Sequence, residues 1–198
     1  TTLFRSDAAS FVRVVDAEGK KVHDLSLPSQ WGACTLAMQN GRGIRKSDSL
    51  ILEFESFVHS PMLLKLTGDQ LSVLYQPNPK TAADIEVRQI FTEAPDGERI
   101  PAFAVMPKGL EKTGKTPTLM YGYGGYNNAI LPSYNNPFVD LDIVDWVSQG
   151  RIYVSINLRG GSEYGTRWHE GGSLSNKKNC FTDFIATAER IQQEGWTC

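Results

Sequence analysis

The chain has 198 residues, 40% of them hydrophobic and 21% charged, which is typical of a globular protein with one good-sized core or two smaller ones. Its 20 lysines and arginines against 22 aspartates and glutamates leave a net charge of -2, so the charge gives no reason to expect nucleic acid or an anionic membrane as partner. No apolar run approaches the roughly 18 residues of a membrane span, and no signal-peptide pattern is found.

Cysteine usage bears on the compartment and on metal binding. Cys34, Cys180 and Cys198 are widely spaced and fit neither a disulfide framework nor a zinc pattern. We therefore expect a reducing, cytoplasmic environment. The sequence also lacks HExxH and any close histidine pair, so no metal and no cofactor are expected.

The first part of the chain, residues 1–77, has an antiparallel β pattern. Turn signals spaced about 8 to 12 residues apart separate short apolar runs, which favours a sandwich or propeller blades. These runs are residues 11–15, 49–55, 61–66 and 71–75. Only about one and a half four-stranded blades would fit, so we expect an incomplete β-propeller.

The pattern changes after residues 77–81, where two prolines indicate a linker. Residues 86–93 and 99–106 flank a Pro-Asp-Gly turn and predict a β-hairpin. A β-prone run at 118–121 follows, and we expect it to be a buried strand.

The next segment predicts a helix. Asn136 suits an N-cap, Pro137 the first helical position, and Gly150 the C-terminal end. The apolar residues at helical spacing are Val139, Ile143, Trp146 and Val147.

A strand at 152–158 and a second helix beginning near Asn179 come next. Gly195 would end this helix, and Asp183 in its first turn and Arg190 in its last would suit the helix dipole. The residues expected on its apolar face are Phe181, Phe184, Ile185, Ala188 and Ile191.

This order of elements predicts an α/β fold, with a mostly parallel sheet covered by helices on both faces. In such sheets ligands bind beyond the carboxyl ends of the strands. Two glycine-rich loops, at residues 122–126 and 159–161, are expected at that edge.

The loop after the run at 118–121 is the most informative stretch. It reads TLMYGYGGYNN over residues 118–128, so glycines that allow positive φ alternate with tyrosine hydroxyls. The alternative is a tight turn with packing tyrosines. A nucleotide-binding reading is disfavoured because Asn127 stands where GxGxxG needs glycine and no phosphate-binding GK[ST] follows.

Together, TLMYGYGGYNN and INLRGGSEYGTRWHEGGSLSNKKNCFTDF at residues 156–184 resemble the prolyl oligopeptidase family of serine peptidases. The resemblance covers roughly residues 84–198, and residues 1–77 match as the expected neighbour. It implies an N-terminal part of an α/β-hydrolase domain at 78–198, preceded by antiparallel β blades of an incomplete β-propeller at 1–77. Relatives that cleave after basic residues tend to have YGYGS in the loop, so GGY, SEYG and NCF favour prolyl oligopeptidase.

The resemblance also implies roles for two tyrosines. Tyr123 matches the tyrosine that the family places in its oxyanion hole, where a phenol O–H would stabilise developing negative charge. Tyr126 matches a position where the family usually has a phenylalanine lining the substrate pocket. Tyr126 keeps the ring but adds a hydroxyl.

Three further polar residues are candidates. Arg159 could contact the substrate or another domain, or it could be a structural arginine bonded to carbonyls and carboxylates, with Glu163 as a partner. His169 could be a general base, but its family counterpart is not the triad histidine, so we favour a structural role.

An α/β-hydrolase needs a nucleophile on a GxSxG elbow, followed by an acid and a histidine. No GxSxG occurs in this sequence, and it has no initiating Met. We therefore expect a segment cut from a longer protein, truncated before the nucleophile elbow and inactive alone.

The leading hypothesis is a segment of a serine endopeptidase that hydrolyses short peptides on the carboxyl side of proline through an acyl-enzyme. Its expected partners are a proline-containing peptide and the remainder of the same polypeptide. The alternative is a truncated, non-catalytic hydrolase-like protein that keeps the loops for binding.

Overall fold

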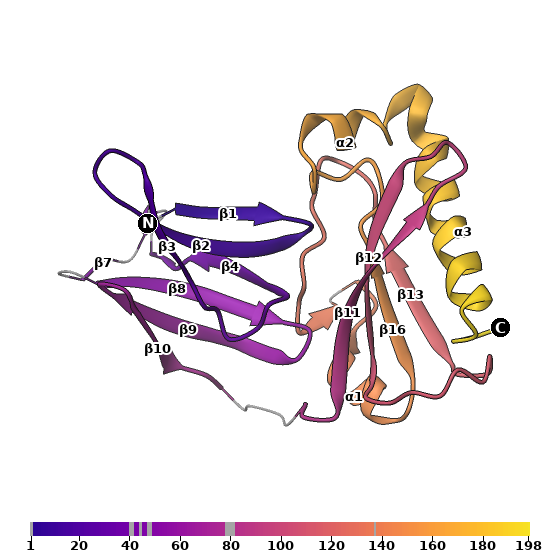
Figure 1. Ribbon diagram of the computed structural model, residues 1–198, viewed down its shortest axis with the longest axis horizontal. Helices are drawn as coiled ribbons and strands as arrows, with labels where there is room; N and C mark the ends of the chain where they lie inside the picture. The colour runs from indigo at the N-terminus through magenta and orange to yellow at the C-terminus, as the bar shows by residue number, and fades with distance from the viewer. Residues whose placement is uncertain (1, 40–41, 44, 47–48, 78–81, 137) are drawn as a thin grey trace. The chain divides into compact units, whose positions relative to one another are not determined.

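The computed structural model describes residues 2–39, 42–43, 45–46, 49–77, 82–136 and 138–198 (Figure 1). The chain forms two compact units. The first unit comprises Thr1–Ala82 and Leu131–Asp140, and the second comprises Ala83–Ile130 and Leu141–Cys198.

The first unit is built from antiparallel sheets. A three-stranded sheet has the order β1-β2-β3, and a larger one has the order β10-β9-β8-β4 with β7 also paired to β8. The bounds are β1 Thr2–Ser6, β2 Ala9–Val15, β3 Lys21–Leu25, β4 Gly32–Leu36, β5 Met38–Gln39, β6 Arg42–Gly43, β7 Arg45–Lys46, β8 Ser49–Ser56, β9 His59–Thr67, β10 Gln70–Tyr75 and β14 Asn135–Asn136. The four predicted strands are confirmed as β2, β8, β9 and β10.

One apolar core joins the two larger sheets of this unit. Its buried members come from β2, β4, β8 and β9 and are Val12, Cys34, Leu52, Phe54, Met62 and Leu64. Successive side chains of a strand point to opposite faces, and β9 alternates buried and less buried residues accordingly. The inward face is therefore encoded by simple alternation, which explains why the sequence predicts these strands well.

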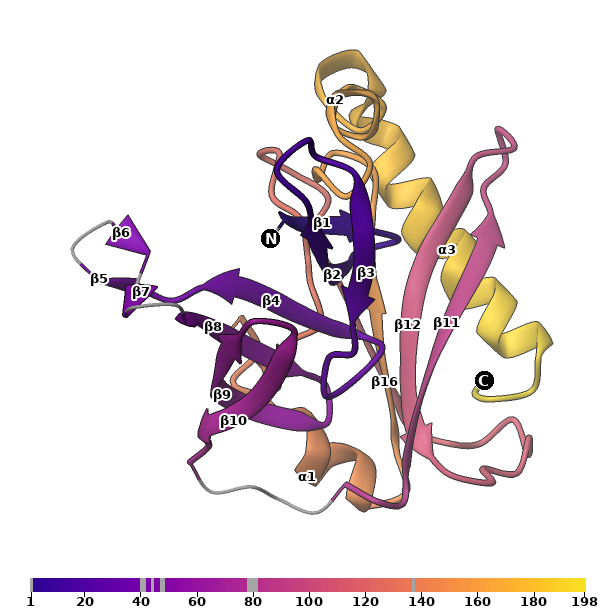
Figure 2. The same ribbon diagram turned by 60° about the vertical axis from the view of Figure 1, so that its left-hand side comes forward.

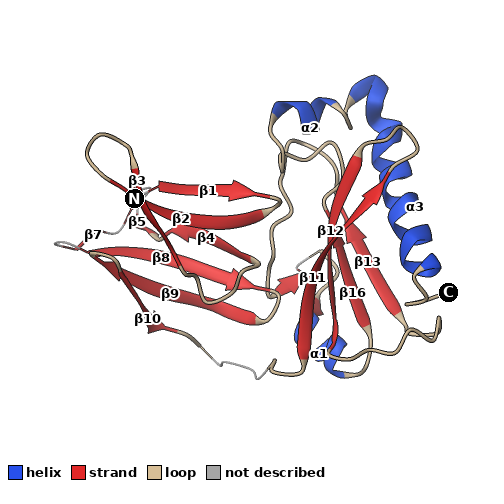
Figure 3. Ribbon diagram, in the orientation of Figure 1, coloured by secondary structure: helices blue, strands red, loops and turns tan. Residues whose placement is uncertain are grey.

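The second unit contains a four-stranded sheet in the order β11-β12-β16-β13 (Figure 3). The predicted hairpin is confirmed as β11 (Ile85–Glu93) and β12 (Arg99–Pro107), closed by hydrogen bonds between Ala94 and both Gly97 and Glu98. β16 (Ile152–Ile156) pairs antiparallel with β12 and parallel with β13 (Thr118–Gly122). The prediction of a mostly parallel sheet is therefore wrong for the described strands, because the hairpin contributes two antiparallel pairs.

Helices cover both faces of this sheet (Figure 2). The even-numbered buried residues of β12 and β16 share one core with Trp168, Cys180 and Ile191. Phe103, Val105, Tyr153 and Ser155, at odd-numbered positions of the two strands, point the other way and are equally buried. α1 (Ile143–Ser148) contacts these same strands. The expectation of helices on both faces is confirmed.

The first helix begins later than predicted. The N-cap is Asp142, at the end of β15 (Leu141–Asp142), and its Oδ1 accepts from the Asp145 N–H at 3.0 Å. Asn136 instead accepts from the Phe138 N–H at 3.0 Å in a turn of its own, and Val139 is exposed. Pro137 lies outside the described residues. The C-terminal prediction is confirmed, since Gly150 has a φ of +80° and its N–H donates to the Val147 carbonyl.

The inward face of the last helix, α3 (Lys177–Gln193), is only partly the one predicted, since Ile191 is buried and Phe184 packs against the core as expected. Its buried residues are Cys180, Asp183, Thr187 and Ile191. Phe181 and Ile185 are instead 60% and 54% exposed. Asp183 lies beyond the first turn, so the helix-dipole role predicted for it is wrong. The inward face is partly polar, and a search for apolar periodicity cannot detect such a face.

Two predicted strands also need correction. β13 lies at the edge of the described sheet and is half-buried along its length, not buried, because a strand pairs with it on only one side. β16 ends at Ile156, so Asn157 and Leu158 belong to the following loop. Two short helical segments, α2 (Thr166–Glu170) and the 3₁₀ turn η1 (Leu174–Asn176), connect that loop to α3.

Candidate active-site loops

The two glycine-rich loops lie side by side, as predicted. β13 and β16 are parallel, with Gly122 opposite Ile156, so the loops that follow them leave the same edge of the sheet. The Asn127 N–H donates to the Gly160 carbonyl at 3.2 Å and joins the two loops directly.

Only glycine fits where these loops meet. A Cβ placed on Gly124 would lie 2.5 Å from the Cys180 sulfur, and one on Gly160 would lie 2.4 Å from the Gly124 carbonyl oxygen. Both residues also have positive φ values, +55° and +102°. A Cβ on Gly172 would lie 2.2 Å from the Arg159 carbonyl carbon. The backbones of three segments are therefore packed against one another without side chains between them.

Tyr123 and Tyr126 project from the first loop. Their rings are stacked with centroids 6.3 Å apart, and Tyr126 is 85% exposed while Tyr123 is 37% exposed. Tyr126 and Asn127 both adopt left-handed backbone conformations, with φ of +51° and +57°. Such conformations cost on the order of 1–3 kcal/mol each outside glycine and cluster at functional sites. The loop thus presents two phenols on a strained turn at the carboxyl end of a parallel strand.

A third phenol belongs to the strand itself. Burial raises the pKa of Tyr121, and the neighbouring Tyr123 shifts it in the same direction. A raised pKa keeps this phenol protonated well above neutral pH.

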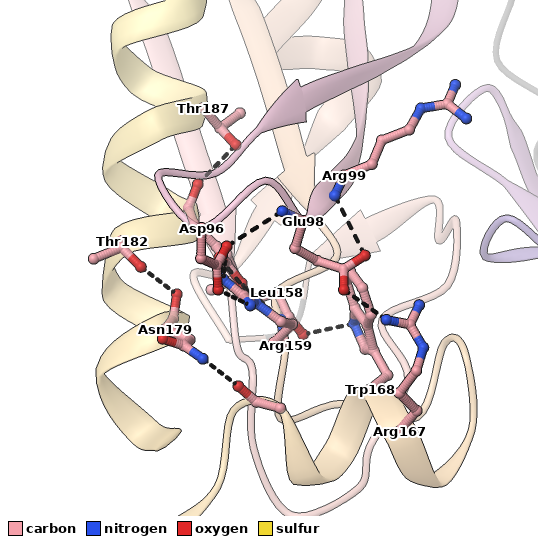
Figure 4. Close-up of polar contacts among 12 residues, drawn as sticks. Asp96, Glu98, Arg99, Leu158, Arg159, Arg167, Trp168, Asn179, Thr182 and Thr187 are labelled. Atoms are coloured by element: carbon pink, nitrogen blue, oxygen red, sulfur yellow. Dashed lines mark hydrogen bonds and ion pairs between the residues drawn. The ribbon is translucent and has the colours of Figure 1, made fainter. Parts of the chain in front are cut away.

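Arg159 starts the second loop and is bound by two carboxylates (Figure 4). Its Nε donates to Asp183 Oδ2 at 3.0 Å and its Nη2 to Asp183 Oδ1 at 2.5 Å. Its Nη1 donates to Asp96 Oδ2 at 2.6 Å. The Arg159 side chain is 6% exposed and that of Asp183 is 0% exposed, whereas Asp96 is half exposed.

The electrostatics of this cluster follow from its burial. Hydrogen bonding to Asp183 is the main reason that the pKa of Arg159 is raised, so the guanidinium stays charged. Hydrogen bonding to Arg159 lowers the pKa of Asp96. Burial raises the pKa of Asp183, and the hydrogen bonds from Arg159 act in the opposite direction.

The other polar candidates support the loops. Glu163 accepts from the Ile130 N–H at 2.9 Å and from Asn157 Nδ2 at 3.3 Å through Oε1. His169 lies on α2, 2.9 Å from the Gly160 carbonyl through Nδ1. A carbonyl can only accept, so Nδ1 carries the proton in this contact and His169 braces the loop.

Sequence reasoning missed several residues of this region. Lys177 Nζ donates to the Gly124 carbonyl at 2.6 Å, and the Cys180 thiol donates to the same oxygen at 3.5 Å. The sequence marks Asp96 only as a turn residue and Asp183 only as a helix-dipole residue. The signal that could have identified Asp183 is its place on the same helical face as Cys180 and Thr187, which implies a buried carboxylate that needs a cation.

Within the described residues, no three His, Cys, Asp or Glu side chains gather as a metal site would require. The described residues likewise include no helix that is both long and apolar enough to cross a membrane.

Known proteins resemble the chain in sequence and in structure. The family model described as the prolyl oligopeptidase family matches residues 138–198. A prolyl endopeptidase of Elizabethkingia miricola is 35% identical over 98% of this chain and 26% of its own length. One from Dictyostelium discoideum is 34% identical over 98% of this chain and 25% of its own length. The chain thus spans about a quarter of the length of these curated relatives.

A solved structure from a study of two prolyl endopeptidases superposes with a TM-score of 0.84 at 33% identity, covering 98% of this chain and 28% of that one. A prolyl oligopeptidase B structure from Galerina marginata, at 23% identity and a TM-score of 0.81 over 99% of this chain and 27% of that one, shares the fold. The antiparallel blades of the first unit are therefore part of a β-propeller region, and the antiparallel hairpin followed by a parallel β-α-β unit is part of an α/β-hydrolase domain. The chain belongs to the prolyl oligopeptidase family of serine peptidases.

Proposed function

We propose that this chain is part of a serine endopeptidase that hydrolyses short peptides on the carboxyl side of proline through an acyl-enzyme. The observation that carries the proposal is the tyrosine loop at residues 122–126, held against a second loop at the carboxyl end of parallel strands. Relatives named prolyl endopeptidase, 35% and 34% identical across nearly the whole chain, support it.

In this proposal Tyr123 is the oxyanion-hole donor. When a serine attacks the scissile carbonyl, negative charge develops on the carbonyl oxygen, and a phenol O–H fixed in advance stabilises it. Tyr123 is 37% exposed, so its loop position is compatible with contact to a bound peptide. Removing one such donor costs on the order of 10²–10³ in kcat.

Tyr126 is proposed to line the substrate pocket with its aromatic ring. Stacking on Tyr123 places the two rings 6.3 Å apart, so a peptide held by one would lie close to the other. The left-handed backbone at Tyr126 fits a residue positioned for binding at a cost in local stability. A direct substrate contact by Arg159 remains a prediction.

The nucleophile, acid and base are proposed to come from the same polypeptide outside these 198 residues, which contain no GxSxG. On this view residues 1–77 are the last blades of the propeller and residues 78–198 the first part of the peptidase domain. The remaining polypeptide would complete both. We also propose a cytoplasmic location, no cofactor or metal, and no nucleic-acid or membrane partner.

The first test is hydrolysis of a short proline-containing chromogenic peptide by the 198-residue chain beside the complete product of the same gene. We expect activity only in the complete product. Activity in the short chain alone would contradict the proposal, because some residue within it would have to be the nucleophile. Inactivity of both would favour the alternative, a non-catalytic binding protein.

The second test replaces Tyr123 with Phe in the complete product. We expect kcat to fall at least a hundredfold, since only the hydroxyl is lost. Tyr75→Phe is the matched control, because Tyr75 is also an exposed tyrosine but lies on β10 of the other unit. Equal activity of the two variants would remove Tyr123 from the mechanism.

A further inference from the structure

The loop that carries Tyr123 rests on a stack of three backbones. Gly124 packs on Arg159 and Gly160, and these in turn pack on Gly172, with no side chain between the layers. The Gly160 carbonyl accepts from both the Asn127 N–H and His169 Nδ1, so it ties the first loop to α2. A shift of the middle layer therefore moves the first loop with it.

The middle layer is held by one carboxylate. Asp183 accepts from the Arg159 backbone N–H at 3.2 Å and from its guanidinium at two nitrogens. Main chain and side chain of Arg159 are thus bound to the same buried group. Asp96, on the hairpin turn, binds the remaining guanidinium nitrogen and fixes its direction from the other side.

The same helix also holds the first layer. Cys180 and Lys177, about one and two helical turns before Asp183, both donate to the Gly124 carbonyl. α3 therefore sets the spacing between the Gly124 and Arg159 layers, because it contacts each of them through a different turn.

We infer that Asp183, acting through Arg159, is a positioning residue that fixes the loop carrying Tyr123. The inference rests on the role proposed for Tyr123 above. Neither Asp183 nor the guanidinium of Arg159 needs to touch the substrate, since both act on the hydroxyl through the packed glycines. The misplacement of a reacting group by about 1 Å can cost on the order of 10²-fold in rate.

The test uses Asp183→Asn in the complete gene product, with steady-state kinetics on a short proline-containing chromogenic peptide. We expect kcat to fall at least tenfold with KM changed less than threefold. We also expect Asp183→Asn to cause little further loss when Tyr123 is already Phe, because both changes remove the same stabilisation. If the fold loss in kcat of the double variant equals the product of the two single losses, the inference is overturned.

A readout independent of activity separates this inference from the proposed function. Amide hydrogen exchange of residues 122–128 should be faster in Asp183→Asn. Faster exchange, together with a Tyr123→Phe variant of normal activity, would keep the positioning role and reject the oxyanion role. Unchanged exchange in Asp183→Asn, together with a lowered kcat in Tyr123→Phe, would keep the oxyanion role and reject the positioning role.

Two further variants keep the test decisive if Asp183→Asn does not fold. Asp96→Asn removes the half-exposed partner, and Arg159→Lys keeps the charge but loses the two-nitrogen contact. Each of these two variants should lower kcat and speed the amide exchange of residues 122–128, as expected for Asp183→Asn. Unchanged kcat and unchanged exchange in both variants would overturn the inference. Glu86→Gln is the matched control, because it breaks the surface pair between Glu86 and Arg88 in the same unit and should change neither readout.

Discussion

Two ionic clusters in the molecule have similar contacts but different surroundings. On the three-stranded sheet of the first unit, Asp24 accepts from Arg13 at 2.7 Å and from Lys21 at 2.7 Å, and all three side chains are at least a third exposed. In the second unit, Arg159 donates to two aspartates at similar distances, but it and Asp183 are almost completely buried.

The difference shows that burial, not distance, decides what an ion pair does. Charges in water are screened and gain little from pairing, whereas a buried charge that loses its partner is left without solvent. The Asp24 cluster is therefore expendable. The Arg159 cluster is instead expected to be needed for the stability of the loops that it contacts.

The largest effect is expected from Asp183→Ala. The change leaves the Arg159 guanidinium buried with only the half-exposed Asp96 beside it, so the free energy of unfolding should fall by about 3–5 kcal/mol. Urea denaturation of this chain measures the change. Glu189→Ala, an exposed carboxylate on the same helix, should alter stability by less than about 0.5 kcal/mol. Equal losses of stability in the two variants would refute the distinction between a buried and an exposed carboxylate.

The next largest effect is expected from Gly160→Ala. The new methyl group would lie 2.4 Å from the Gly124 carbonyl oxygen at a φ of +102°, so unfolding free energy should fall by about 3 kcal/mol. Gly150→Ala separates the two causes. Gly150 has a φ of +80° but no atom within 4 Å of a new Cβ, so its loss should be nearer 1 kcal/mol. Similar losses of unfolding free energy in Gly160→Ala and Gly150→Ala would mean that contact of the new methyl group with neighbouring atoms is unimportant.

A smaller effect is expected on acidification. Because Arg159 lowers the folded-state pKa of Asp96, this carboxylate contributes stability above its unfolded pKa of about 3.9, and the contribution disappears as pH falls through the lower folded value. Asp96→Asn should therefore flatten the loss of stability as the pH falls below about 4. Urea midpoints of both proteins across this range test the point, and parallel curves would contradict it.

The smallest effect is expected from Asp24→Asn. Asp24 is exposed, and salt screens both of its ion pairs. The variant and the unchanged chain should therefore have the same urea midpoint at neutral pH. A clear loss of stability that persists in high salt would show that this cluster is not the simple surface pair described above.

Much of the fold could be predicted because its signals are local. The Pro-Asp-Gly turn places all four ends of the hairpin strands within one residue, and Gly150 and Gly195 mark the ends of α1 and α3. The start of α1 could not be predicted from the Asn136-Pro137 pair, because Asp142 is an equally good cap and lies next to the buried residues. The half-buried state of β13 depends on its neighbours in the sheet, which its own sequence does not describe.

The candidate site divides in the same way. The glycine loops and their meeting could be predicted from strand order and loop composition. The partners of Arg159 could not, because Asp183 is 24 residues away and Asp96 is 63 residues away, on elements whose apolar pattern does not reveal a buried carboxylate. Glu163, much closer along the chain, was the more obvious choice but has other hydrogen-bonding partners.

The Arg159 cluster also has a consequence for the order of assembly. It joins the hairpin turn, the loop after β16 and the middle of α3, so it can form only after all three have come together. Contacts between distant segments form late because the intervening chain must be ordered first. The tyrosine loop should therefore reach its final geometry only when the hairpin and the last helix have docked, so this region matures at the end of the folding of its unit.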